Sequence, residues 1–344
     1  MRPFLATLVR VNPHDASQKQ LYHLEVLLRC YNQTIVSEQT LALICLFIAS
    51  FLWATVGTVA KFILKDIDPL TAVTLRMIIA ALVLTPVLIA RRKQAISMFL
   101  HVLPVSLFSA INVYLFLVGI NKTTSNASAV VYTATPLLVL IIGYFFIKEQ
   151  PTIKKVAGIV VGLLGVLVIL LVPLIQHHDL ALGTFSGNAI LFLAVCSWAL
   201  YTVSVRRLVS EKKYSPIMIT AITFFISSVL FILLSFLIPH TTQTPITHIS
   251  IHLWILLIYY GVFTTVFTYL LHQWVIKHSS ASTGALTHYI QPIFAVVINW
   301  YFLKEIVTPT FFLGGTLVIG GVFLASGSQA KAYIHRLRKK RENK

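Results

Sequence analysis

Ten long apolar runs take up most of this chain, and they restrict its fold more than any other feature does. Each run has about 20 residues rich in Leu, Ile and Val, which is the length that an α-helix needs to cross a membrane. The runs cover residues 41–64, 70–90, 96–119, 124–147, 154–175, 186–206, 216–238, 252–276, 281–303 and 309–328. They are continuous rather than alternating, which excludes the strands of a membrane β-barrel. We therefore predict an all-α polytopic membrane protein with ten transmembrane helices.

The composition excludes several other classes of protein. Of the 344 residues, 57% are hydrophobic and 11% are charged, whereas soluble domains carry about 25% charged residues. Because of this hydropathy, we attribute the net charge of +17 to contact with a lipid bilayer and expect no nucleic-acid partner. The sequence contains no phosphate-binding glycine loop, nucleophile elbow or defined metal-ligand spacing. We therefore expect no enzymatic activity, no cofactor and no metal site.

The distribution of Lys and Arg predicts the orientation in the membrane. With the N-terminus in the cytoplasm, the segments on that side contain 22 Lys and Arg residues and the opposite loops contain three. Cytoplasmic segments of membrane proteins are enriched in these residues. We therefore predict a multi-pass protein of a bacterial inner (plasma) membrane with both termini in the cytoplasm. Residues 1–40 form a tail that is either disordered or contains an interfacial helix around Leu21–Leu28, and residues 329–344 form a basic tail.

An internal repeat relates the two halves of the chain, 41–175 and 186–328. A shift of 156 residues superimposes a proline, a Lys-Glu pair and two glycines: Pro136 on Pro292, Lys148-Glu149 on Lys304-Glu305, Gly158 on Gly314 and Gly165 on Gly321. Each repeat contains five runs, so the second repeat crosses the membrane upside down relative to the first. Inverted repeats are typical of secondary transporters, whose substrate site lies near the midplane between the halves.

The chain also resembles a known family. The paired segments Tyr132–Val168 and His288–Leu324 each have a proline, a Lys-Glu pair and a glycine-patterned helix, as in the EamA-type branch of the drug/metabolite transporter superfamily. Trp53-Ala54, Asp68-Pro69 and Arg76 in the first repeat also fit that family. The resemblance implies a carrier of small metabolites, frequently an exporter of amino acids or related compounds.

Polar residues around the two mid-span prolines are the first candidates for a substrate site. Proline removes a backbone hydrogen bond from a helix, and the freed carbonyl group must be buried in protein or face water. We predict that Pro136 and Pro292 are hinges, the alternative being kinks that serve packing alone. The polar residues predicted to line a cavity beside them are Tyr132, Thr135, His288 and Gln291.

Further candidates lie at mid-depth in other runs. Tryptophan usually lies at the membrane interface, so Trp53 and Trp198 near the middle of their runs indicate a cavity wall or, alternatively, core packing. Asn112 must face another helix or a cavity, because an unsatisfied amide in lipid is costly. The eighth run ends with three polar residues on one helical face: Tyr269, His272 and Gln273.

Lys61 and Arg76 are the only full charges well inside the predicted spans. A charge within a membrane is a hypothesis for function, and Arg76 would attract a carboxylate or phosphate group of a substrate. A structural ion pair with Asp66 or Asp68 in the adjoining loop, or snorkelling of the side chain to the membrane interface, is the alternative.

These observations predict a secondary transporter that moves a small polar metabolite, an amino acid or a related compound, by alternating access, with export favoured. Uptake or exchange of a nucleoside-like or adenosyl metabolite is the alternative within transport. A membrane scaffold or a lipid-modifying enzyme is the alternative of another class. None of the ten runs contains Asp or Glu, so proton coupling would use His272 or His288. The glycine-patterned helices leave open a homodimer.

Overall fold

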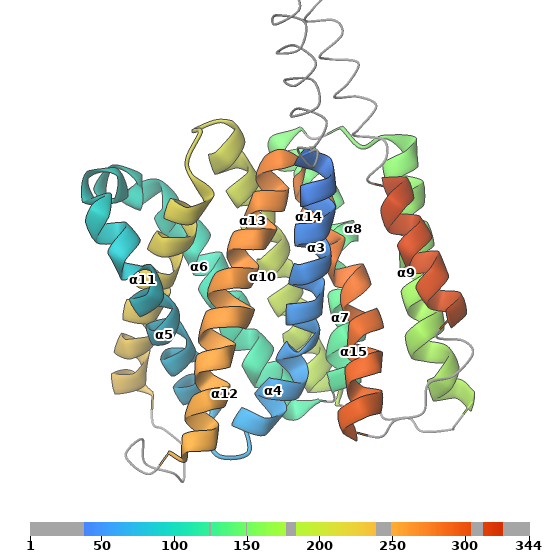
Figure 1. The fold of residues 1–344 in the computed structure, drawn as a ribbon, viewed down its shortest axis with the longest axis horizontal. Helices are drawn as coiled ribbons and strands as arrows, with labels where there is room; N and C mark the ends of the chain where they lie inside the picture. Colours follow the sequence, from blue (N-terminus) through green and yellow to red (C-terminus); the bar gives the residue numbers. More distant parts are fainter. Residues whose placement is uncertain are drawn as a thin grey trace, which may run out of the picture. The chain divides into compact units, whose positions relative to one another are not determined.

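The computed structural model describes residues 38–123, 125–148, 150–176, 184–238, 249–303 and 312–325. Within these ranges the chain is helical between short turns and contains no strand (Figure 1). The helices are α3 (Glu38–Ala54), α4 (Val56–Ile63), α5 (Pro69–Ala90), α6 (Arg92–Lys122), α7 (Ser125–Tyr132), α8 (Thr135–Ile147), α9 (Ile153–Gln176), α10 (Phe185–Ser210), α11 (Pro216–Leu237), α12 (Ile251–Gly261), the π-helix η2 (Val262–Phe267), α13 (Thr268–His278), α14 (Ala281–Ala285), α15 (Thr287–Leu303) and the helix Phe312–Ala325. The segment Leu21–Leu28 and the basic tail 329–344 lie outside the described residues.

Six helices of the described ranges are long and apolar enough to cross a membrane. They are Leu41–Ile63, Pro69–Ala90, Arg92–Lys122, Phe185–Ser210, Pro216–Leu237 and Ile251–His278. The first combines most of α3 with α4, and the last combines α12, η2 and α13. α9 spans the whole of the fifth predicted run, and the fourth, ninth and tenth runs contain shorter helices. The protein is therefore a multi-pass membrane protein whose described part is all-helical, and the ten inverted spans stay a prediction.

The fourth and ninth predicted runs are broken rather than continuous. In the fourth, α7 ends at Tyr132 and α8 begins at Thr135, which places Pro136 in the first turn of α8. A proline there costs no helical hydrogen bond, because the first N–H groups of a helix have no partner within it. In the ninth, the break lies at Leu286, and Pro292 is inside α15. Pro292 therefore does not mark the break in its own run.

A capping contact replaces one of the predicted ion pairs. Asp68 Oδ1 accepts hydrogen bonds from the backbone N–H groups of Leu70 and Thr71, at 2.9 and 3.1 Å, and so caps α5. Lys61 Nζ donates to the backbone carbonyl of Thr123 at 2.7 Å. In the described residues neither Lys61 nor Arg76 forms an ion pair with Asp66 or Asp68, so that alternative is wrong.

The two halves pack against each other through long helix pairs. Among the described helices, α6 and α10 form the most extensive pair, and α5 lies along α11 (Figure 1). The largest core cluster contains side chains from both halves, including Met77, Leu117, Tyr201 and Phe224. Burial of these large side chains fixes the halves around the region in which the candidate site lies.

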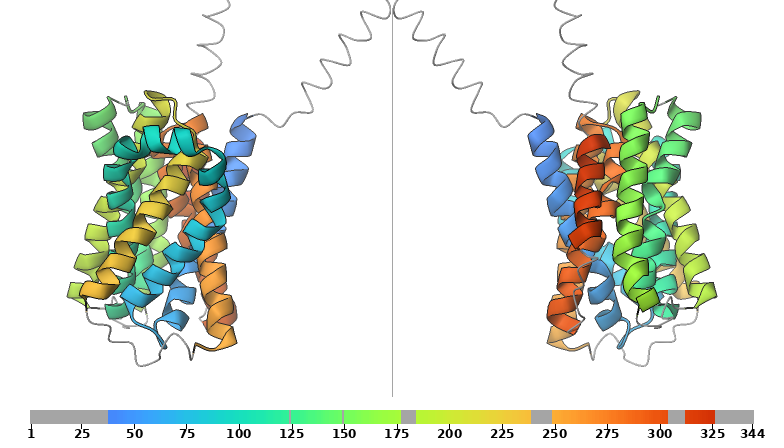
Figure 2. Two further views of the ribbon diagram at one scale, coloured as in Figure 1. Left: turned by 90° about the vertical axis from the view of Figure 1, so that its left-hand side faces the viewer. Right: turned by 90° about the vertical axis from the view of Figure 1, so that its right-hand side faces the viewer.

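Glycines bring α9 close to the helix Phe312–Ala325, which lies beside it (Figure 2). A Cβ atom at Gly158 would lie 2.6 Å from the carbonyl oxygen of Gly321, and one at Gly165 would lie 2.6 Å from that of Gly314. Glycine therefore allows the two backbones to approach at these positions. These glycines serve a contact within the chain, and the homodimer stays a prediction.

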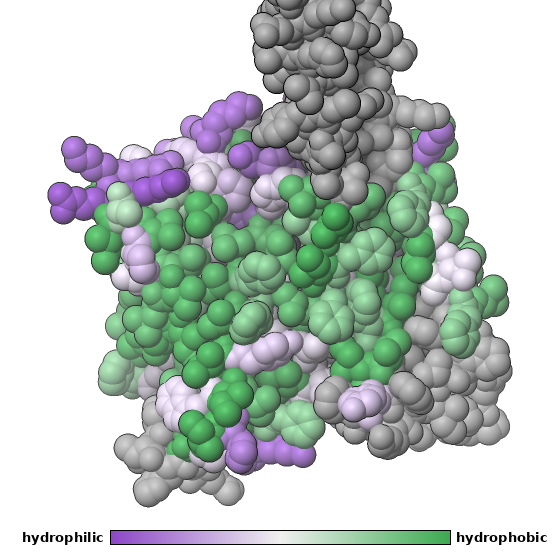
Figure 3. Space-filling model, viewed as in Figure 1, coloured by the Kyte–Doolittle hydropathy of each residue, from purple (hydrophilic) through white to green (hydrophobic). Residues whose placement is uncertain are grey.

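Apolar side chains cover the middle of the molecule on the face drawn in Figure 3, and hydrophilic residues gather toward its ends. Large hydrophobic side chains that are more than half exposed include Leu82, Ile89, Phe145 and Phe236. Soluble monomers rarely expose contiguous apolar patches of this kind. The surface is therefore suited to contact with lipid.

Candidate functional site

A cavity lies where helices of both halves meet. Its volume is about 60 Å³, and it is lined by Trp53, Val56, Arg76, Asn112, Val113, Phe116, Ser128, Tyr132, Trp198, Tyr269, His288 and Gln291. These residues belong to α3, α4, α5, α6 and α7 in the first half and to α10, α13 and α15 in the second. Binding pockets for drug-sized molecules measure about 300 Å³ or more. The cavity is smaller than such pockets.

Aromatic rings form one wall of the cavity. The rings of Trp53 and Trp198 meet edge to face, with centroids 5.3 Å apart. Trp53 also stacks on the ring of His288, with 5.4 Å between centroids and 8° between ring planes. Tyr269 lies 5.3 Å from Trp198, again measured between centroids. Aromatic pairs of this geometry contribute about 0.5–1.5 kcal/mol each beyond the area they bury, so the rings hold one another in place.

Asn112 connects three helices through its amide nitrogen. Nδ2 donates to Tyr132 Oη in α7 and to the backbone carbonyl of Ala194 in α10, each at 2.8 Å. Both N–H groups of the amide are thereby used. Among the described residues its Oδ1 has no protein donor, so this oxygen is available to an N–H or O–H group of a ligand.

Gln291 connects the two halves. Its Nε2 donates to the backbone carbonyl of Trp53 at 3.1 Å, and its Oε1 lies 3.2 Å from Nδ1 of His288. The carbonyl group of Trp53 is available because α3 ends at Ala54 and α4 begins at Val56. Since Oε1 can only accept, His288 carries its proton on Nδ1 and leaves Nε2 as an acceptor. That Nε2 is buried without a hydrogen-bond partner among the described residues.

Arg76 places a positive charge beside the cavity. Its Nε donates to Thr265 Oγ1 at 2.6 Å, and its Cζ lies 4.1 Å from the centroid of the Tyr260 ring. Thr265 belongs to the π-helix η2, where its hydroxyl group donates to the backbone carbonyl of Tyr260, five residues earlier, at 2.7 Å. Thr265 was not predicted from the sequence. The only available signal was two consecutive threonines, Thr264 and Thr265, in an apolar run.

The sequence of each half matches one known family. Residues 40–171 and 185–327 both match the EamA-like transporter family. This chain belongs to that family. Among its relatives, the uncharacterized transporter YoaV of Bacillus subtilis is 24% identical over 279 residues, which cover 80% of this chain and 93% of that protein. The S-adenosylmethionine/S-adenosylhomocysteine transporter of Chlamydia trachomatis is 25% identical over 294 residues, which cover 81% of this chain and 88% of that protein.

The fold of this EamA-like transporter is also similar to that of a protein with a known crystal structure. The TM-score is 0.65 at 18% sequence identity, and the superposition covers 85% of this chain and 98% of the other. At this level of identity the likeness shows a shared fold alone.

Three of the residues predicted for the site of this EamA-like transporter do not line the cavity. His272 is fully buried behind the aromatic wall, with its ring centroid 5.1 Å from that of Trp53. Gln273 Nε2 donates to Tyr201 Oη at 2.6 Å, and Thr135 is buried in the first turn of α8. The remaining eight predicted residues line one cavity, and their part in binding stays a prediction.

Four lining residues were not predicted: Val56, Val113, Phe116 and Ser128. Apolar residues and a single serine carry no signal in a membrane span, because most such residues contact lipid or neighbouring helices.

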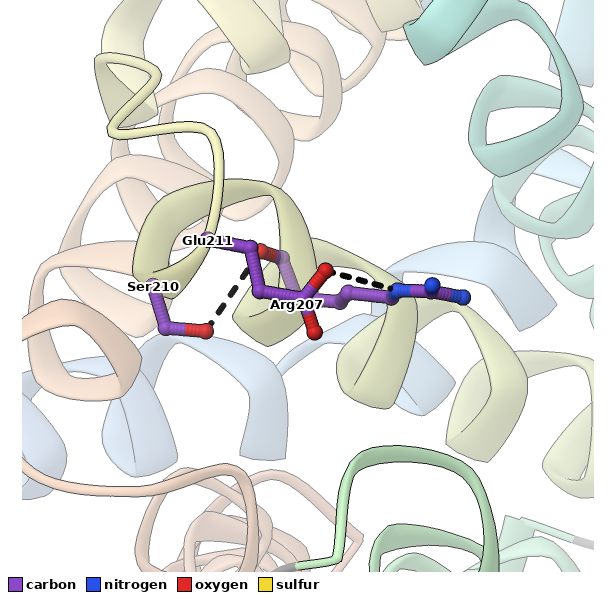
Figure 4. A network of polar contacts seen from close by, with 3 residues as sticks. All are labelled: Arg207, Ser210 and Glu211. Carbon is purple, nitrogen blue, oxygen red and sulfur yellow. Dashed lines mark hydrogen bonds and ion pairs between the residues drawn. The ribbon is translucent and has the colours of Figure 1, made fainter.

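An exposed ion pair lies at the end of α10 (Figure 4). Arg207 Nε is 3.0 Å from Glu211 Oε2, and the two side chains are 60% and 52% exposed. Exposed pairs four residues apart contribute about 0.3–0.5 kcal/mol. Glu149 and Glu211 are the two acidic residues of the predicted cytoplasmic loops between spans, and Glu211 contacts Arg207 at the surface. This contact gives no support to the lipid-modifying alternative.

Proposed function

We propose that this EamA-like transporter moves a small polar metabolite, an amino acid or a related compound, by alternating access, with export as the favoured direction. The observation that carries the proposal is the cavity between the halves, in which aromatic rings surround Arg76, Asn112 and Gln291. Binding sites for small molecules have this character, with mostly apolar walls and a few placed polar groups. The partners required are the metabolite and the lipid bilayer.

Contacts between corresponding residues support an arrangement of ten helices in two inverted repeats. Tyr132 and His288 correspond under the shift of 156 residues, and their ring centroids lie 5.5 Å apart. Trp53 and Trp198, which do not correspond under this shift but each lie near the middle of the first span of a repeat, are also in contact. A site beside the axis that relates two inverted repeats is typical of transporters in which the halves exchange conformations.

The depth of the lining residues supports a state that is closed toward the cytoplasm. In the predicted orientation α7 begins at the outer surface, and Ser128 lies in its first turn. Toward the opposite side, Tyr201 and Gln273 are fully buried, and Lys155 Nζ donates to Ser280 Oγ at 3.0 Å. Thus Arg76 and Ser128 lie in the outer halves of their predicted spans, and packed helices lie on the cytoplasmic side of the cavity.

Transport of an adenosyl compound is the second candidate function. Two observations favour it: the S-adenosylmethionine/S-adenosylhomocysteine transporter of Chlamydia trachomatis among the relatives, and the stacked rings of Trp53 and His288. Aromatic faces of this kind stack well on a purine ring.

Counterflow in liposomes tests both candidates. The full chain is reconstituted with one unlabelled compound inside, and entry of the same labelled compound is measured for amino acids, S-adenosylmethionine, S-adenosylhomocysteine and sugars. We expect accumulation of one class of compound. Liposomes that contain the folded protein but accumulate none of them would support the scaffold or lipid-modifying alternatives. A matched variant, Asn112→Leu, should reduce accumulation if the cavity is the route.

A further inference from the structure

Among the residues that line this cavity, Arg76 most restricts the chemical class of ligand that can bind. Building on the proposed function, we propose that Arg76 binds a carboxylate group of the transported metabolite, and that this single negative charge is a requirement for transport.

The charge of Arg76 has no counter-ion within the described residues. Its side chain is 4% exposed, and its recorded hydrogen bond is the one from Nε to Thr265. None of the ten apolar runs contains Asp or Glu, and Asp68 caps the start of α5. An uncompensated charge in a membrane interior is strongly unfavourable and marks a functional site by default.

The surrounding residues hold the guanidinium group in a fixed orientation. The hydroxyl group of Thr265 donates a hydrogen bond to the carbonyl of Tyr260. A lone pair on Thr265 Oγ1 is therefore free to accept the hydrogen bond from Nε of Arg76. The ring of Tyr260 covers the guanidinium group at 4.1 Å. The threonine is in position because η2 is a π-helix, in which a residue meets the carbonyl group five positions earlier.

The two Nη nitrogens of Arg76 remain available, and they match a carboxylate. In the described residues neither has a protein acceptor, and Arg76 lines the cavity. The two parallel N–H groups of a guanidinium fit the two oxygens of a carboxylate in a planar, bidentate pair. The geometry of the site therefore favours a group with two oxygens in one plane.

The rest of the lining contains no second permanent charge. One guanidinium neutralises one carboxylate, whereas a phosphate dianion would leave an excess negative charge in the low-dielectric interior. Asn112 offers Oδ1 as an acceptor, and the rings of Trp53 and Trp198 offer flat apolar faces. An ammonium group suits both of these surroundings. The ligand class that fits is a zwitterion or monoanion with one carboxylate.

Matched pairs of ligands test the proposal without any variant. Counterflow and the thermal stability of the purified full chain are measured with each of the common L-amino acids, S-adenosylmethionine and S-adenosylhomocysteine, and with the carboxamide of each compound. We expect at least one carboxylate compound to bind, and its carboxamide to bind about tenfold more weakly or worse. Equal binding of acid and carboxamide, or no carboxylate ligand in the whole panel, overturns the proposal.

Variants assign the effect to Arg76. Arg76→Gln should weaken binding of the carboxylate ligand about tenfold or more and change binding of its carboxamide less than about twofold. Arg76→Lys should restore part of the affinity, and Thr265→Val should lower it to a smaller extent, because Thr265 is a positioning residue. Lys61→Gln is the control, since Lys61 donates to the carbonyl of Thr123 and does not line the cavity.

The outcomes separate this inference from the proposed function. Specific binding of a carboxylate that depends on Arg76, without counterflow, would contradict transport and support the carboxylate site. Counterflow that is equal in the wild type and in Arg76→Gln would support transport and overturn the carboxylate site. If Arg76→Gln does not fold, Arg76→Lys and the acid and carboxamide pairs decide the question.

Discussion

The indole ring of Trp53 meets that of Trp198 edge to face, with 5.3 Å between centroids and 86° between ring planes. Each tryptophan lies near the middle of the first span of its half, so the contact joins the halves at the cavity. The two rings also differ, because Nε1 of Trp198 is buried without a hydrogen-bond partner among the described residues.

The first prediction concerns that N–H group. Trp198→Phe keeps an aromatic ring and removes the N–H with part of the buried indole, so we expect a smaller loss of stability than for Trp198→Ala and about a tenfold loss of counterflow if the N–H serves the substrate. Trp198→Ala should lower stability by about 3–5 kcal/mol, because it removes a large buried ring. Thermal unfolding and counterflow measure the two effects. Trp274→Phe is the control, because Trp274 stacks on His278 away from the cavity lining. Normal counterflow by Trp198→Phe would show that the N–H has no part in transport.

The second prediction concerns the link from Asn112 to Tyr132. Asn112→Leu should cost about 1–3 kcal/mol of stability, because it leaves Tyr132 Oη buried without its donor, whereas the carbonyl of Ala194 keeps its partner within α10. Tyr132→Phe should cost less, because Asn112 keeps its second hydrogen bond. We expect the two substitutions together to cost less than their sum, with a coupling energy of about 0.5–3 kcal/mol. Additive effects on thermal unfolding would contradict this link.

Much of the cavity lining could be predicted from the sequence. Asn112, Tyr132 and Gln291 interrupt apolar runs, and a polar side chain in a membrane must contact protein or water. The same reasoning applies to Trp53 and Trp198, which lie far from the interfaces that tryptophan prefers. These residues line the cavity in the structure, because polar atoms at mid-depth in a membrane must be kept away from lipid. The same reasoning does not tell a cavity from a contact with protein, and Gln273, which also interrupts an apolar run, donates to Tyr201 instead.

Contacts that depend on helix geometry could not be predicted. Thr265 reaches Arg76 through a π-helix, whose extra residue per turn changes the face on which each later side chain lies. The two mid-span prolines occupy matching sequence positions, yet Pro136 begins a helix and Pro292 lies inside one. Which backbone hydrogen bonds break depends on neighbouring helices, and a single sequence does not show those neighbours.

The third prediction concerns the contact between α9 and the helix Phe312–Ala325. Gly158→Ala should lower the temperature of unfolding, because its Cβ would lie 2.5 Å from the backbone nitrogen of Ala325. Overpacking of this kind costs about 1–3 kcal/mol. Gly315→Ala is the matched control, because a Cβ at Gly315 meets nothing within 4 Å. We expect it to be neutral or to raise stability by up to about 1 kcal/mol, as alanine favours a helix. Equal effects of the two substitutions would contradict the close contact.

The fourth prediction concerns the closure on the predicted cytoplasmic side. Lys155 is 4% exposed, and its Nζ donates to Ser280 Oγ at the start of α14. Lys155→Met removes a charged hydrogen bond worth about 1.5–3 kcal/mol, so α14 should separate more often from its neighbours. To measure this, a cysteine is introduced by Ser282→Cys in a chain whose three native cysteines are replaced. Position 282 lies in α14 and is 1% exposed. The quantity measured is the rate at which a thiol reagent modifies this cysteine.

We expect Lys155→Met to raise that rate about tenfold or more, because an opening equilibrium changes tenfold for each 1.4 kcal/mol. Lys154→Met is the control, since Lys154 is exposed and precedes Lys155 in the same helix turn. A transported compound that favours the outward-facing state should slow modification of the cysteine, because a ligand shifts the population toward the state that it binds. If Lys155→Met and Lys154→Met change the rate equally, the hydrogen bond to Ser280 does not hold this side closed.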